Sequence, residues 1–475
     1  MLETVRGSHL SISLKLRECI LRNSSTGRLS LYSQRVLTRD SIGPGRIDVH
    51  HGCIAEVMLG DAALAAPLDG ARAVDCGDQV LMAGLVDSHV HVNEPGRTEW
   101  EGYESATRAA ALGGVTAICD MPLNSMPVTT SLQALETKIA STHNQLWIDV
   151  GFWGGVVPGN QGELAEMVQA GVRGFKCFLC PSGIDEFPAA DATDLRIAMP
   201  ILKEAGVPLL VHAELELPLQ QVGLGEEDPR EYATYLHSRP PEWEDAAVAM
   251  MIELVRETGC PVHIVHLSSA GSVPLLAKAK KEGLPITAET CPHYLCLQAE
   301  DIPLGDTTYK CAPPIRGREN RDTLWRALSD GVIDFVVTDH SPCIPGLKKL
   351  EAGNFMEAWG GIASLQLGLS AVWTEAKRRG ISLPTVHRWM ATGSSALMGL
   401  SRGSLVQGAQ ADIVAFDPDA GFVVDPASLA HKNAISAYRG KSLQGVVQHV
   451  WLAGEQIVAD GAMQGVPRGR ALLRA

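Results

Sequence analysis

The chain has 475 residues, of which 45% are hydrophobic and 20% charged, and its formal net charge at pH 7 is −14. This length allows one large α/β domain with an accessory domain, and the composition is that of a globular protein. The acidic balance disfavours nucleic acid or an anionic membrane as a partner, and no apolar run is long enough to cross a bilayer.

The first 29 residues differ from the rest of the chain. They hold five basic residues against two acidic ones, with serines between them. This composition is typical of an organellar targeting segment, and a poorly ordered extension is the alternative. The eleven cysteines are scattered and odd in number, which predicts reduced thiols. We therefore expect an intracellular protein, cytoplasmic unless residues 1–29 direct it to an organelle.

Short strands and turns are predicted at both ends of the chain, over residues 30–83 and 403–465, with no helical periodicity. Two all-β stretches at opposite ends can pair into one domain. We expect residues 30–83 and 403–475 to form a small β-sandwich domain, with the segment between them inserted into it.

The middle of the chain, residues 84–402, alternates apolar β-rich runs with amphipathic runs. Helices are expected at 161–170, 195–205, 243–258 and 273–282. Eight such β–α units predict an α/β fold, a (β/α)8 TIM-type barrel. The predicted strands are 84–92, 115–121, 147–153, 172–179, 207–214, 260–268, 286–294 and 334–341.

Polar side chains stand at or near the ends of five of these apolar strands. Because the active sites of such barrels lie at the carboxyl ends of the strands, we expect these side chains to meet there. Strand alternation places His89 and His91 on the same side, where two imidazoles can bind one divalent ion. A lone histidine is more often an ordinary core residue, but the joint pattern favours a metal site. The candidate metal ligands are His89, His91, Lys176, His212, His266 and Asp339.

Lys176 lies in the middle of the apolar run GFKCFLC. A buried lysine is costly unless it is paired, neutralised or chemically altered. A neutral amine in a dry pocket can add carbon dioxide to form a carbamate, whose two oxygens can each bind one of two metal ions. The alternative is a buried salt bridge from Lys176 to Asp185 or Asp339.

This arrangement predicts a hydrolase for an amide-like bond. Two metal ions that share a bridging water lower the pKa of that water toward neutrality. Asp339 is predicted to be the catalytic general base and acid, which takes a proton from that water and returns it to the leaving nitrogen.

The segments that carry these residues resemble the cyclic amidohydrolases of the amidohydrolase superfamily, and among them the allantoinases. The similarity covers roughly residues 30–465 and implies the barrel and flanking β-sandwich of that family. The matching segments are DSHVHVNEPGRTEWEG (87–102), DMPLNSMP (120–127), GFKCFLCPSG (174–183), VHAE (211–214), HIVHLSSA (263–270), AETCPHYL (288–295), CAPPIRGREN (311–320) and DHSPC (339–343).

The resemblance implies two divalent metal ions per chain, with zinc ahead of manganese, cobalt or iron. Lys176 would be an N6-carboxylated lysine that bridges the two ions. His89 and His91 would bind one ion together with Asp339, and His212 and His266 would bind the other.

The resemblance also suggests substrate-contacting residues, namely Asn93, Asn124, Ala312 and Ser341. Dihydroorotases have an arginine at the position of Asn93, and this arginine binds the substrate carboxylate through two hydrogen bonds. Asn93 cannot supply that bidentate contact, which disfavours a ring that carries a carboxylate. Allantoinases usually have an acidic residue at that position, which leaves the role of the first loop open. Asn124 is equally well explained as a turn residue.

The expected function is therefore hydrolysis of the cyclic amide of allantoin to allantoate, with the small molecule as the partner and a homo-oligomer, dimer or tetramer, as the expected assembly. The alternative enzyme is a dihydropyrimidinase or hydantoinase. A third hypothesis is a non-catalytic scaffold on the same fold, and the presence of all six candidate ligands argues against it.

Overall fold

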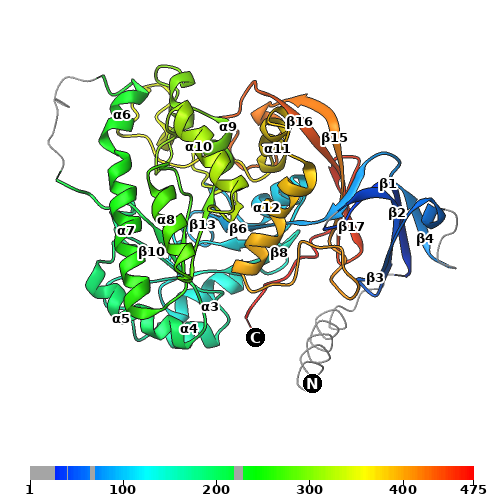
Figure 1. Cartoon of the computed structure of the whole chain (residues 1–475), viewed down its shortest axis with the longest axis horizontal. Coiled ribbons are helices and arrows are strands. Elements are labelled where there is room, and N and C mark those ends of the chain that lie inside the picture. The colour runs from blue at the N-terminus through cyan, green and yellow to red at the C-terminus, as the bar shows by residue number, and fades with distance from the viewer. Residues whose placement is uncertain (1–26, 40, 65–69, 219–227, 475) are drawn as a thin grey trace.

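The computed structural model of the chain describes residues 27–39, 41–64, 70–218 and 228–474. The predicted targeting segment at residues 1–29 lies outside these ranges except for its last three positions. Parallel strands and helices alternate through the middle of the chain, and antiparallel strands from both ends lie together at one side of the barrel (Figure 1).

The middle of the chain forms a closed barrel of parallel strands. Nearly all residues of these strands are buried, as expected where helices cover the outside and side chains fill the inside. The strands are β6 (Leu85–Val90), β7 (Val115–Asp120), β8 (Asp149–Phe152), β9 (Gly154–Gly155), β10 (Phe175–Phe178), β11 (Leu209–His212), β12 (Val262–Ile264), β13 (Ile286–Thr290) and β14 (Phe335–Val336).

These nine strands occupy eight positions around the barrel. Only Trp153 separates β8 from β9, and β8 pairs with β7 while β9 pairs with β10, so the two occupy one position. The ring closes where Val90 of β6 bridges His340, just after β14, and the backbone N–H of His91 donates to the carbonyl of His340 at 2.8 Å. The closure brings the ends of the first and eighth strands into contact.

Helices follow the strands in the expected order and cover the barrel (Figure 1). The helix predicted at 243–258 begins two residues earlier, at Pro241, because proline is favoured in the first turn of a helix. The strand predicted at 286–294 ends at Thr290, because Pro292 starts a helix instead. The helices are α2 (Tyr103–Leu112), α3 (Leu132–Ser141), α4 (Leu164–Gln169), α5 (Ala192–Glu204), α6 (Tyr232–Ser238), α7 (Pro241–Thr258), α8 (Ser272–Lys281), α9 (Pro292–Cys296), α10 (Arg318–Ser329), α11 (Gly368–Arg378) and α12 (Leu383–Leu397).

The two ends of the chain share one nine-stranded sheet, as predicted. The junction is antiparallel, with Ala83 of β5 opposite Ile413 of β15. Cys53, at the start of β3, also bridges Gln410, so the sheet curls around a core of its own. The strands are β1 (Leu29–Leu37), β2 (Ile42–His50), β3 (Cys53–Leu59), β4 (Arg72–Asp75), β5 (Val80–Ala83), β15 (Ile413–Val423), β16 (Ser442–Leu452), β17 (Glu455–Ala459) and β18 (Ala462–Met463).

These features confirm the predicted fold class, a TIM-type barrel inserted into a small β-domain. The limits 30–83, 84–402 and 403–475 stay a prediction. Beyond the last strand, the chain returns to the barrel, where the N–H of Leu472 donates to the carbonyl of Val150 at 2.7 Å.

Nine of the eleven cysteines carry free thiols, and eight of these nine are buried. They include Cys177 and Cys180, which are core residues. Cys53 is disulfide-bonded, which departs from the expectation of reduced thiols throughout. Among the residues that the structure describes, none of the helices is both long and apolar enough to span a membrane.

A buried ion pair fixes the end of the second barrel strand. Lys138 of α3 donates to Asp120 of β7 at 2.7 Å, and both side chains are fully buried. Asp120 also accepts from the hydroxyl of Tyr103 at 2.8 Å and from the N–H of Val92 at 3.0 Å. The carboxylate thus holds two helices and the loop that follows His91.

We predict that Lys138→Met lowers the free energy of unfolding by about 3–5 kcal/mol, because it leaves the Asp120 carboxylate buried without its cation. Urea denaturation followed by circular dichroism measures the change. The double variant Lys138→Met/Asp120→Asn should recover part of the loss. A single variant as stable as the parent protein would show that the pair contributes nothing.

Candidate metal centre

The six predicted ligands converge at the carboxyl end of the barrel. Around Asp339, its Oδ1 lies 3.1 Å from Nε2 of His89 and 3.6 Å from Nε2 of His91. On the opposite side, Nδ1 of His212 lies 2.9 Å from Nε2 of His266. The rings of His89 and His266 are 5.4 Å apart between centroids, so the two groups form one cluster.

Lys176 lies inside this cluster. Its Nζ is 3.1 Å from Nε2 of His89, and only 1% of the residue is exposed. The predicted alternative, a salt bridge to Asp185 or Asp339, is absent from the described part of the chain, and Asp185 is exposed. Burial lowers the pKa of Lys176 to about 8, against the opposing pull of Asp339 and Glu289. This unpaired lysine among imidazoles therefore gives up its proton more readily than an exposed lysine does.

The donor set fits divalent metal ions. One nitrogen or oxygen from each of His89, His266 and Asp339 lies within 4.8 Å of the others, so side chains from both sides of the cluster can contribute to one metal centre. Imidazole and carboxylate together suit zinc and its first-row neighbours. Nδ1 of His266 has no hydrogen-bond partner within the described residues, although it is buried. The cluster can therefore hold cations that satisfy lone pairs which the protein leaves unpaired.

The backbone at this end of the barrel is strained at four predicted site residues. The φ angles are 38° at His266 and 44° at Asp339, in the left-handed region that side chains other than glycine rarely occupy. Asn93 and Asn124 adopt φ angles of 68° and 70°. Strain of this kind collects at functional sites, where the surrounding structure holds it.

Glu289, on β13, orients His89. Its Oε1 accepts from Nδ1 of His89 at 2.5 Å, and its Oε2 lies 3.0 Å from Nε2 of His263. Burial alone would raise the pKa of Glu289, but His89 and His263 bring it down to about 2. Because the ionised carboxylate can only accept, it fixes the proton of His89 on Nδ1 and leaves Nε2 facing Lys176 and Asp339.

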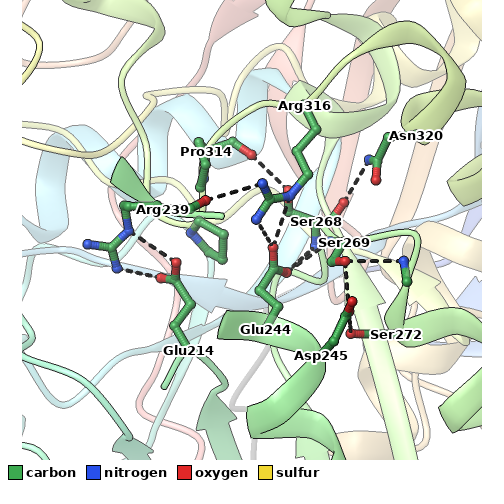
Figure 2. Close-up of polar contacts among 12 residues, drawn as sticks. Glu214, Arg239, Glu244, Asp245, Ser268, Ser269, Ser272, Pro314, Arg316 and Asn320 are labelled. Carbon is green, nitrogen blue, oxygen red and sulfur yellow. Dashed lines mark hydrogen bonds and ion pairs between the residues drawn. The ribbon is translucent and has the colours of Figure 1, made fainter. Parts of the chain in front are cut away.

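Two Glu–Arg pairs, which Figure 2 shows, support His212 and the loop that carries His266. Glu214 accepts from Nε2 of His212 at 2.7 Å and from two nitrogens of Arg239 at 3.1 and 2.5 Å. Burial alone would raise the pKa of Glu214, but Arg239 and His212 lower it to about 2. The proton of His212 is therefore held on Nε2, and Nδ1 faces His266.

The second pair fixes the loop that carries His266 (Figure 2). Glu244 of α7 accepts from the N–H groups of Ser268 and Ser269 at 3.0 and 2.9 Å and from Arg316 at 2.6 Å. Nη1 of Arg316 also donates to the carbonyl of Arg239 at 3.2 Å, which joins the two pairs. The geometry of both histidines thus depends on one buried ionic network.

A cavity of about 600 Å³ opens above the cluster, a size suited to a small molecule. Of the predicted substrate-contacting residues, Asn124, Ala312 and Ser341 line it. The hydroxyl of Ser341 also donates to Oδ1 of Asp339 at 3.0 Å. Asn93 does not line the cavity, and its amide donates instead to the carbonyl of Pro342 at 3.4 Å.

Residues 80–457 match the profile of the Amidohydrolase family, which is most of the chain. The chain belongs to the amidohydrolase family. Its metal dependence is consistent with the family and with the ligand cluster described above.

Named relatives of this amidohydrolase are similar over most of their length. An allantoinase from Streptomyces avermitilis is 49% identical over 94% of this chain and 98% of its own. A mitochondrial allantoinase from Aquarana catesbeiana is 48% identical over 82% of this chain and 80% of its own. The structure of an L-hydantoinase (dihydropyrimidinase) from Arthrobacter aurescens superposes with a TM-score of 0.86, at 28% identity over 94% of this chain and 99% of that one.

Sequence reasoning missed the acidic residues that hold the histidines. Glu214 and Glu289 are charged residues in or just after otherwise apolar strands of this amidohydrolase, the same signal that marked Lys176. Arg239 and Lys310 also line the cavity. Both lie outside the strands, where no hydrophobic periodicity marks a polar residue as unusual.

We predict that Glu289→Gln weakens metal binding by roughly 10- to 100-fold, the usual effect of removing the partner of a metal-bound histidine. Competition with a chromophoric chelator measures the affinity. Glu282→Gln, which alters a surface carboxylate paired with Arg256, is the matched control and should bind metal normally. Unchanged affinity in Glu289→Gln would refute an orienting role.

Proposed function

We propose that this amidohydrolase opens the hydantoin ring of allantoin by hydrolysis of a cyclic amide, giving allantoate. The observation that carries the proposal is the convergence of four imidazoles, Lys176 and Asp339 at the floor of a small cavity. The 49% identity to the Streptomyces allantoinase, over nearly the whole of both chains, supports allantoin as the substrate.

A hydantoinase or dihydropyrimidinase activity is the second candidate, because the L-hydantoinase structure superposes closely. Its identity of 28% is much lower than that of the allantoinase relatives. A shared fold carries less weight for substrate choice than residues at the site. We therefore rank it behind allantoin hydrolysis.

The ligand assignment is part of the proposal. His89, His91 and Asp339 would hold one divalent ion, and His212 and His266 the other, with zinc as the first choice. Bound ions of this kind polarise a substrate carbonyl and make water a nucleophile near neutral pH. Carboxylated Lys176 would bridge the two ions, supported by its burial, its lowered pKa and its lack of a carboxylate partner.

Asp339 is suited to be the proton shuttle. It lines the cavity. Burial alone would raise the pKa of its carboxyl, but the neighbouring His89, His266 and His91 hold this pKa well below the usual value. It therefore starts ionised and can accept a proton from the attacking water. The same carboxyl can then protonate the leaving ring nitrogen. Ser341 steadies the carboxylate by donating its hydroxyl to Oδ1.

Asn124, Ala312 and Ser341 are placed to position the ring. All three line the cavity, and Nδ2 of Asn124 lies 3.4 Å from Nδ1 of His91. We include Asn93 in the proposal only through its hydrogen bond to the carbonyl of Pro342, the residue that follows Ser341.

The assembly and compartment are proposed on narrower grounds. A homodimer or homotetramer follows from the resemblance alone. An intracellular location, cytoplasmic or organellar through residues 1–29, is supported by the free thiols and by a close relative that is named mitochondrial.

The direct test is a substrate panel on the purified protein, with allantoin, hydantoin, dihydrouracil and dihydroorotate, each assayed before and after removal of metal by a chelator. Allantoin should give the highest kcat/KM, and chelation should abolish the activity until zinc, manganese or cobalt is restored. Faster turnover of dihydrouracil or hydantoin than of allantoin would favour the second candidate.

Lys176→Ala should lose most bound metal and most activity, because the bridge between the two ions disappears. Short carboxylic acids added to the assay should restore part of both, since they supply the missing carboxylate. Metal content by elemental analysis and kcat measure the effect. Full activity of Lys176→Ala without additives would rule out the carbamate.

Asp339→Asn should lower kcat by at least about 10²–10⁴-fold, the usual contribution of general acid–base catalysis. KM should change little, because substrate binding draws on other groups. Steady-state kinetics on the metal-loaded variant measure both constants. A near-normal kcat with both ions bound would assign the shuttle to another residue.

A further inference from the structure

The cavity wall outside the ligand cluster carries two cationic side chains, Arg239 and Lys310. Arg239 is neutralised by its two hydrogen bonds to Glu214 (Figure 2). Its guanidinium also lies 5.9 Å from the ring of Trp243, which fixes it further. Arg239 is therefore committed to the support of His212.

Lys310 is not committed in this way. The residue is 8% exposed, and its contacts within the described residues include no ion pair with a carboxylate. Its ammonium donates to the carbonyl of Met356 at 3.1 Å and lies 4.9 Å from the centre of the Tyr235 ring. An ammonium has three N–H donors, so two remain for a molecule in the cavity.

A neighbouring lysine shows the contrast. Lys348 is more deeply buried than Lys310, and its ammonium donates to three carbonyls, those of Lys310, Trp359 and Gly361. Lys348 is therefore a structural residue with every donor used. Because Lys310 lines the cavity, its two remaining donors are available to a bound molecule that supplies acceptor oxygens.

We infer that Lys310 is a specificity-determining residue that donates a hydrogen bond to an acceptor oxygen on the ring substituent of the substrate, the ureido carbonyl of allantoin. The inference rests on the proposed function. A hydantoin ring whose amide lies at the ligand cluster extends its substituent toward the rest of the cavity wall, and Lys310 is the cation available there.

The proposed contact does not depend on whether the amine of Lys310 is charged. Burial, with Lys348 and Arg239 nearby, lowers the pKa of Lys310 to about 8. Both protonation states keep N–H donors, so the contact does not need an anionic ligand. A site built around such a donor discriminates against rings that lack the acceptor, because the buried donor then stays unpaired.

The experiment compares Lys310→Met with the parent protein. It measures kcat/KM for allantoin and the competitive inhibition constants of hydantoin, which has no substituent, and hydantoin-5-acetate, which has a carboxylate. We expect kcat/KM for allantoin to fall by roughly 10- to 100-fold, the value of a hydrogen bond to a charged group. Hydantoin inhibition should change less than about threefold, the scatter expected when no contact is lost.

Control variants separate this role from a structural one. Lys310→Arg should recover part of the loss. Lys377→Met removes another lysine that lies over an aromatic ring, Trp373, but outside the cavity, and should leave allantoin kinetics unchanged. If Lys310→Met fails to fold, Lys310→Leu, which likewise has no donor, carries the same comparison.

Three results would overturn the inference. The first is unchanged kcat/KM for allantoin in Lys310→Met. The second is a parallel loss of hydantoin binding, which would mean that Lys310 only holds the segment around Met356. The third is a selective loss for hydantoin-5-acetate, which would assign the contact to a carboxylate. A parent protein without allantoin hydrolysis would overturn the proposed function itself, and this inference with it.

Discussion

A lysine buried among imidazoles, with no carboxylate to pair it, is the constraint on which the rest of this site depends. Nζ of Lys176 lies 3.1 Å from Nε2 of His89, in a cluster of ligands whose only acidic side chain is Asp339. Such a group is costly as an ammonium, and as a neutral amine it is a nucleophile that can add carbon dioxide. In the proposed site, carboxylation and divalent metal ions would together remove this cost, because the negative carbamate and the positive ions would compensate each other's charge.

The same constraint explains the charged residues around the cluster. Glu289 and Glu214 each hold one histidine by the nitrogen that points away from the centre, and Arg239 balances the charge of Glu214. Glu244 and Arg316 then fix the loop of His266. These pairs are buried, where the loss of one partner leaves an uncompensated charge. The barrel supplies a rigid frame, and the ionic network sets the direction of each ring.

Much of this site could be predicted from the sequence for a physical reason. Strands of a parallel barrel are buried on both faces, so a polar residue within them needs an explanation, and His89, Lys176 and His212 stood out on that ground. The shared sheet of the two ends followed from their common β pattern, as β5 and β15 show. Contacts across strands could not be predicted. The pairing of Glu289 with His89 joins positions 200 residues apart, and Lys310 lies in a segment without periodicity.

The central claim is that Lys176 carries a carboxyl group between two metal ions. The most direct measurement is ¹³C NMR of metal-loaded protein prepared with ¹³C-bicarbonate, alongside elemental analysis of bound metal. The account predicts one carbamate resonance that is missing from Lys176→Ala, and two metal ions per chain in the parent protein. Two bound ions without a carbamate resonance, or a resonance that persists in Lys176→Ala, would contradict it.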